Sequence, residues 1–197
     1  MSPVHKLSQM GSLTTTKTDY PTMLANYGDF GALQRIGFQT ISGSSTSSIS
    51  FNNIPQNFQD LIVVGNFRND SASGQGLNIY PNNTSTNSNT SLRGDGSTAS
   101  SNRNSSIAIQ NYMFTTTLGT GVFESTIIHI LNYANTSTFK TFLSRRAADN
   151  NGSGVTELGV GTARITASIT SLVIAAPSGN YTAGSTFSLY GVKASAA

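Results

Sequence analysis

Short apolar runs separated by turn residues are the feature that most constrains the fold of this chain. From about Gln34 onwards, runs rich in aliphatic, aromatic and β-branched residues alternate with stretches of Gly, Asn, Ser and Pro. Such runs are typical of β-strands, and the longest of them spans residues 122–131. No helical periodicity extends beyond one turn. We therefore predict about nine or ten strands, at intervals of roughly 8–15 residues.

This spacing predicts an all-β fold, an antiparallel two-sheet sandwich that is jelly-roll-like. Leu61, Ile62, Val63 and Val64 form a continuous apolar run, which is typical of a strand buried on both faces. Residues 81–106 are almost wholly polar, so we expect a long loop there. We expect two parts, an N-terminal anchoring arm at 1–30 and the β-sandwich at 31–197.

The predicted arm lacks strand alternation, and only residues 19–24 suggest a single helical turn. It nevertheless carries apolar side chains, which gain free energy only when a neighbour covers them. We therefore expect the arm to be extended and to anchor the chain to a neighbouring subunit. The residues expected to make this assembly contact are Val4, Leu7, Met10, Leu13, Tyr20, Met23 and Leu24.

The composition offers few groups for catalysis. Cysteine and tryptophan are absent, there are two histidines, and only 10% of the residues are charged, whereas Ser, Thr and Asn make up roughly a third of the chain. The net charge of +3 comes from scattered Lys and Arg residues, so we predict no nucleic-acid binding. No apolar run has the length of a membrane span, so we expect no membrane insertion. We predict a non-enzymatic protein with no catalytic, metal or cofactor-binding residues and no cofactor.

Two motifs invite a chemical interpretation, and each has a simpler one. His129 lies in a strand-like run, where a hydrogen-bonded sheet histidine is more common than a catalytic one. Residues 149–154 (DNNGSG) resemble the start of a calcium loop, but Val160 stands where such a loop needs a bidentate Glu. No two acidic residues lie together in the sequence as a glycosidase pair, although the fold can bring such residues together.

The polar stretch 81–106 is the best candidate for ligand binding, because adaptable polar side chains lie there between two tyrosines. Host surface glycan is the ligand that such a loop suits, and a solvated linker is the alternative. The residues expected to face a ligand are Tyr80, Asn82, Asn83, Asn87, Asn89, Arg93, Asp95, Arg103 and Tyr112.

Six segments resemble a family of virion structural proteins of tailed bacteriophages. They are 4–18 (VHKLSQMGSLTTTKT), 49–56 (ISFNNIPQ), 94–97 (GDGS), 130–136 (ILNYANT), 148–154 (ADNNGSG) and 187–193 (FSLYGVK). One departure is Arg93, where an aromatic residue is expected. The resemblance implies a non-enzymatic, tail-associated component (fibre, spike or minor tail) that forms a homo-oligomer and contacts other virion proteins. A capsid decoration protein and a lectin-like module that binds host glycan are the alternatives. The implied location is the virion, after synthesis in the host cytoplasm.

Overall fold

The computed structural model describes residues 32–71, 76–105, 109–110 and 118–193. Apart from Ala32, these residues belong to a compact unit that spans Leu33–Ala197. The predicted arm, residues 1–30, lies outside the described residues, and so does Tyr112 of the predicted ligand-facing set.

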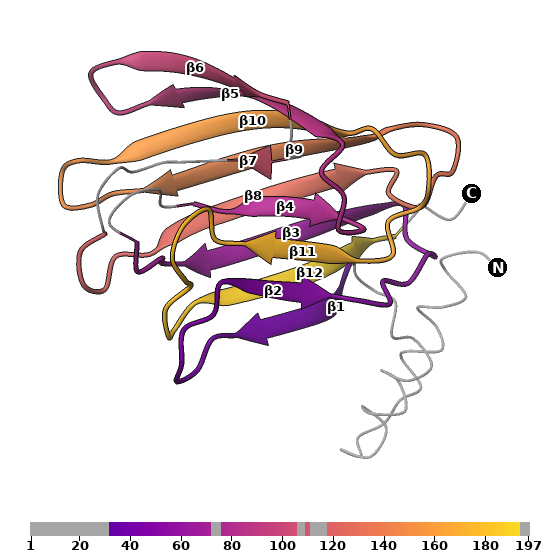
Figure 1. The fold of residues 1–197 in the computed structure, drawn as a ribbon, viewed down its shortest axis with the longest axis horizontal. Coiled ribbons are helices and arrows are strands. Elements are labelled where there is room, and N and C mark those ends of the chain that lie inside the picture. The colour runs from indigo at the N-terminus through magenta and orange to yellow at the C-terminus, as the bar shows by residue number, and fades with distance from the viewer. Residues whose placement is uncertain (1–31, 72–75, 106–108, 111–117, 194–197) are drawn as a thin grey trace, which may run out of the picture. The chain divides into compact units, whose positions relative to one another are not determined.

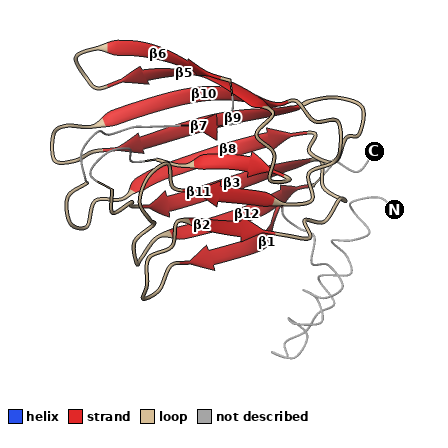
Figure 2. Ribbon diagram, viewed as in Figure 1, coloured by secondary structure: helices blue, strands red, loops and turns tan. Residues whose placement is uncertain are grey.

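All regular secondary structure in the described part of the chain is β-strand (Figure 2). The strands lie close to the predicted runs because turn residues separate apolar segments of strand length. They are β1 (Leu33–Thr40), β2 (Ser48–Phe51), β3 (Asp60–Phe67), β4 (Asn78–Pro81), β5 (Asn87–Gly94), β6 (Ala99–Asn104), β7 (Ile109–Gln110), β8 (Glu124–Leu131), β9 (Lys140–Ala148), β10 (Val155–Ala163), β11 (Leu172–Ala175) and β12 (Thr186–Val192).

The strands form two antiparallel sheets (Figure 1). The larger sheet has eight strands in the order β1-β12-β3-β8-β9-β10-β5-β6, and the smaller has four in the order β2-β11-β4-β7. The predicted all-β, antiparallel two-sheet sandwich is thus confirmed. The jelly-roll-like connectivity and the arm stay predictions.

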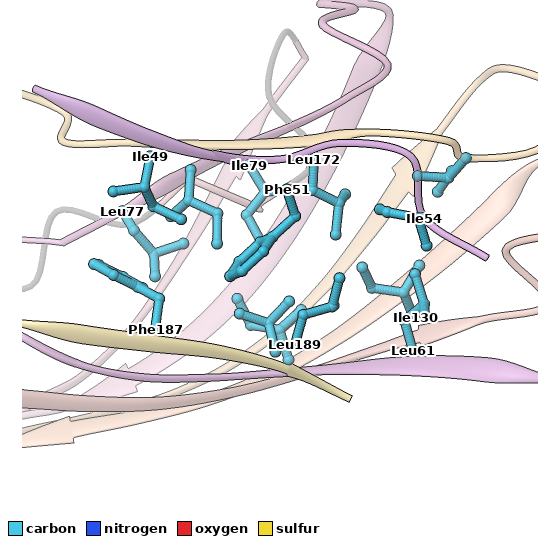
Figure 3. Packing of buried hydrophobic residues seen from close by; sticks show 14 of the residues in the cluster. Ile49, Phe51, Ile54, Leu61, Leu77, Ile79, Ile130, Leu172, Phe187 and Leu189 are labelled. Atoms are coloured by element: carbon cyan, nitrogen blue, oxygen red, sulfur yellow. The ribbon is translucent and has the colours of Figure 1, made fainter. Parts of the chain in front are cut away.

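Apolar side chains from both sheets pack between the layers. Ile49 and Phe51 of β2 and Ile79 of β4 lie opposite Phe187 and Leu189 of β12 (Figure 3). The rings of Phe67, Tyr181 and Phe187 meet at centroid distances of 4.9–5.4 Å. These contacts identify the sandwich interior as the hydrophobic core.

Two predictions about individual segments are wrong. Val63 is fully buried, but its neighbour Val64 is 38% exposed, so β3 is covered on one face only. Residues 81–106 are not a long loop, because they contain β5 and β6, which pair as a hairpin. These polar residues form strands because β5 pairs along its whole length with β10, and β6 pairs with β5, so that strand pairing outweighs the weak strand preference of Asn and Ser.

Candidate interaction surface

The face of the eight-stranded sheet that points away from the smaller sheet, here called the outer face, carries two apolar rows. Strand register places Val64, Ile127, Arg145, Leu158 and Leu92 side by side across β3, β8, β9, β10 and β5. The adjacent row across the same strands is Ile62, His129, Leu143, Val160 and Thr90. We call these two rows together the apolar stripe.

The aliphatic side chains of the stripe are open to solvent. Ile62 is half-buried, and the exposed fractions of the other six run from 38% for Val64 to 63% for Leu92. Of the nine large hydrophobic residues that are exposed in the described part of the chain, eight lie on the outer face: Leu33, Phe38, Val64, Leu92, Ile127, Leu143, Leu158 and Val160. Single exposed hydrophobic residues are ordinary, whereas a contiguous patch marks an interaction site.

Polar residues border the stripe. On one side the neighbouring row is Asn66, Ser125, Ala147 and Thr156, and on the other side it includes Leu131, Thr141 and Thr162, so both border rows are mainly polar. An apolar centre with a polar border is the usual composition of a protein–protein interface. The outer face therefore has the layout of a docking surface.

Arg145 is the cation at the centre of the stripe. It is exposed and lies between Ile127 and Leu158 on the neighbouring strands. A shallow groove of about 500 Å³ includes Arg145, Leu158 and Leu92 in its lining. The long aliphatic part of an arginine side chain packs on apolar surface while its guanidinium reaches water, so Arg145 does not interrupt the stripe.

His129 lies in the stripe and is held by a carboxylate from the neighbouring strand. Its Nε2 lies 3.0 Å from Oδ2 of Asp60, whose Oδ1 accepts a hydrogen bond from the backbone N–H of Asn132 at 2.7 Å. The residues paired with His129 on the two adjacent strands are Ile62 and Leu143, neither of which is a nucleophile. The geometry therefore fits a hydrogen-bonded sheet histidine, as the sequence predicted.

The inner face of the same strands contains a buried ionic cluster. Nη1 of Arg146 lies 2.9 Å from Oε1 of Glu124, and Nη2 of Arg146 lies 3.6 Å from Oε2 of Glu157. All three side chains are nearly inaccessible to solvent. The fold thus brings together two carboxylates that lie 33 positions apart in the sequence.

Burial sets the protonation of this cluster. Desolvation raises the pKa of Glu124 to about 7, although the charge of Arg146 opposes the shift. Desolvation also raises the pKa of Glu157 and lowers that of Arg146. Because a buried charge without full compensation is costly, the carboxyl groups retain protons to higher pH than free ones. The cluster is a source of pH-dependent stability.

The described residues of the predicted ligand-facing set lie on different parts of the sandwich. Asn87 and Asn89 of β5 are buried on the inner face, whereas Arg103 of β6 lies on the outer face. Tyr80 belongs to β4 in the smaller sheet.

Asn82 holds another loop in place, because its Oδ1 accepts hydrogen bonds from the backbone N–H groups of Thr170 and Ser171. Asn83 follows it with a positive φ of 54° and is exposed, and Arg93 lies at the end of β5.

Asp95 and Asp149 hold the turns at one end of the sandwich. Oδ1 of Asp95 accepts hydrogen bonds from the backbone N–H groups of Ser97 and Thr98, which lower its pKa to about 2. Oδ1 of Asp149 accepts from the backbone N–H of Gly152 at 2.7 Å. These are turn-forming contacts. Among the described residues, no three His, Cys, Asp or Glu side chains are grouped so as to hold a metal ion.

Sequence reasoning missed the outer face, Asp60 as the partner of His129, and the cluster around Arg146. A signal for the first was present, since the apolar run at residues 61–64 and the pair Leu158 and Val160 put apolar groups on outward positions. The other two depend on strand pairing between segments far apart in the sequence, which periodicity within one segment does not reveal.

Comparisons with protein-family models, with curated proteins and with solved structures find no match to this chain. No helix in the described part of the chain is long and apolar enough to cross a membrane.

Proposed function

We propose that this chain is a non-enzymatic structural protein of a bacteriophage virion, a tail-associated subunit that assembles as a homo-oligomer. The observation that carries the proposal is the apolar stripe. Monomeric soluble proteins rarely expose contiguous apolar surface of more than a few hundred Å². A stripe across five strands favours a subunit whose outer face is covered in its working state.

The bacteriophage part of the proposal is supported by the family resemblance alone. In the structure, the described segments that carry it form strands and turns: 49–56 includes most of β2, 94–97 begins at the end of β5, 130–136 begins with the last two residues of β8, 148–154 links β9 to β10, and 187–193 includes most of β12. These segments build the sandwich and the turns at its ends. A likeness in such segments supports a shared scaffold that presents surface.

Mass spectrometry of purified particles tests this function. A tail-associated subunit is expected in the virion at the low copy number of the tail proteins. A copy number similar to that of the capsid protein would favour the alternative, a capsid decoration protein. Absence of the chain from the purified particles would contradict both.

A glycan-binding role is a second candidate, favoured by one observation. A cleft of about 650 Å³ opens at the end of the sandwich that carries the turns after β5 and β9, and Asp95, Phe123 and Asp149 contribute to its lining. Carboxylates beside an aromatic ring suit the hydroxyls and the apolar face of a sugar. Binding of the isolated protein on a glycan array, lost in Asp95→Ala and Asp149→Ala, would support this role.

A further inference from the structure

The apolar stripe lies at the middle of the eight-stranded sheet. Four strands, β1, β12, β3 and β8, lie on one side of the boundary between β8 and β9, and four, β9, β10, β5 and β6, lie on the other. Ile127 and His129 flank this boundary on β8, and Arg145 and Leu143 flank it on β9. Apolar side chains continue outward on both sides, to Val64 on β3 and to Leu158 and Leu92 on β10 and β5, so that β9 is the middle strand of the stripe.

We propose that a second copy of this chain covers the stripe, outer face against outer face, about a twofold axis near the boundary between β8 and β9. The inference rests on the proposed function as a homo-oligomer and names the surface and the partner. In an isologous dimer the same patch is used twice, so the patch must complement itself. A stripe centred on the sheet meets this requirement, because a twofold axis through its centre places aliphatic rows on aliphatic rows.

The size of the outer face fits such a dimer. Eight strands at about 4.8 Å spacing make the sheet roughly 34 Å wide, and strands of about eight residues make it roughly 26 Å long. The face therefore covers roughly 900 Å², against about 800 Å² that each partner contributes to a stable interface of standard size. Twisted sheets that pack face to face cross at about −30°, so contact is closest at the centre and weaker at the corners.

The distribution of side chains matches this pattern of contact. The exposed aliphatic groups occupy the two central rows, whereas the border rows, apart from Ala147 and Leu131, carry Ser, Thr and Asn, which tolerate water. The polar groups at the centre of the stripe can keep partners in the dimer. His129 already contacts Asp60, and the long aliphatic part of the Arg145 side chain lets its guanidinium reach the polar border. The β-strand run at residues 61–64, apolar on both faces, is also typical of a strand that is covered on both sides.

Sedimentation velocity of the full chain over a range of concentrations tests this proposal. The double variant Val64→Thr with Val160→Thr replaces one methyl group with a hydroxyl at each position in the stripe. Both side chains stay β-branched and keep about the same size. The matched control is Val173→Thr in β11, a half-buried valine on an outward position of the smaller sheet. We expect the wild type and the control to dimerise, and the double variant to dissociate with a Kd at least tenfold higher. Circular dichroism should be the same for all three proteins.

Three results would overturn the proposal, and they separate it from the proposed function. An oligomer that the double variant leaves intact would contradict the stripe as the interface but would leave a homo-oligomeric subunit standing. Equal weakening by Val173→Thr would place the interface on the smaller sheet. A wild type that is monomeric at every concentration would contradict both the shared interface and the homo-oligomer.

Discussion

Each face of strands β8, β9 and β10 departs in part from the usual arrangement of a soluble β-sheet, because the inner face adds buried charges to apolar residues such as Ile128 and Phe142. Toward the sandwich interior these strands carry Glu124, Arg146 and Glu157, which are buried. Toward solvent they carry Ile127, Leu143, Leu158 and Val160, which are exposed. Alternation of polar and apolar residues therefore identifies these segments as strands but does not identify which face of each strand points inward. Pairing with neighbouring strands decides which face is covered.

The largest difference in stability is expected between aspartate substitutions at two adjacent valines of β3. Val63→Asp places a carboxylate without a partner in the core, which is among the most destabilising single changes. We expect this variant to be insoluble on expression. Val64→Asp puts the same charge on the outer face, so we expect it to fold and to remain monomeric. Soluble yield and circular dichroism measure both, and a soluble, native-like Val63→Asp would show that the two faces of β3 have been assigned incorrectly.

Two adjacent arginines of β9 provide the next comparison. Arg146→Met removes the cation that contacts both buried carboxylates, Glu124 and Glu157, so we expect a loss of about 3–5 kcal/mol in the free energy of unfolding. Arg145→Met, on the outer face, should change it by less than about 0.5 kcal/mol in the dissociated protein. Urea denaturation at pH 7, at a low protein concentration, gives both values. Equal losses would contradict the burial of the ionic cluster.

The raised pKa of Glu124 predicts a pH dependence of stability. Its pKa of about 7 in the folded protein exceeds the ordinary value of 4.5, so the native state binds more protons than the unfolded state between these pH values. The stability that this group contributes is therefore full below pH 4.5 and is lost as the pH rises through 7, by an amount on the order of 3 kcal/mol. Glu157 shifts in the same direction. In Glu124→Gln the fall should become shallower, and a wild type whose stability rises across this range would contradict the assignment.

Chelation should have the smallest effect. Asp149 already uses Oδ1 to hold its own turn, and Val160, the twelfth residue of the calcium-like stretch, lies on the outer face. We expect EDTA to leave the Tm unchanged. A decrease of many degrees would show that a metal ion stabilises the native state.

The sequence was sufficient to predict the fold class, because turn residues and apolar runs are local signals. The role of Asn82 could not be predicted in this way. The polar composition of residues 81–106 suggested a ligand-facing loop, but the Asn82 side chain fixes the backbone of residues 170–171, which are distant in the sequence. β5 and β6 escaped prediction because their outward residues are mainly Ser and Thr, with Leu92 as an isolated aliphatic group. The apolar stripe was not predicted because its residues come from five strands, and only their order in the sheet makes them neighbours.

Cross-linking at the centre of the outer face measures whether two copies of the chain meet there. The chain has no cysteine, so a single introduced thiol is its only site of reaction. Ile127→Cys lies beside the proposed twofold axis, whereas Ser153→Cys lies in the exposed turn between β9 and β10. With a short bifunctional maleimide, we expect a covalent dimer for Ile127→Cys and a monomer for Ser153→Cys. If Ile127→Cys gives only monomer at a concentration where the protein without cross-linker is dimeric, the outer-face dimer is contradicted.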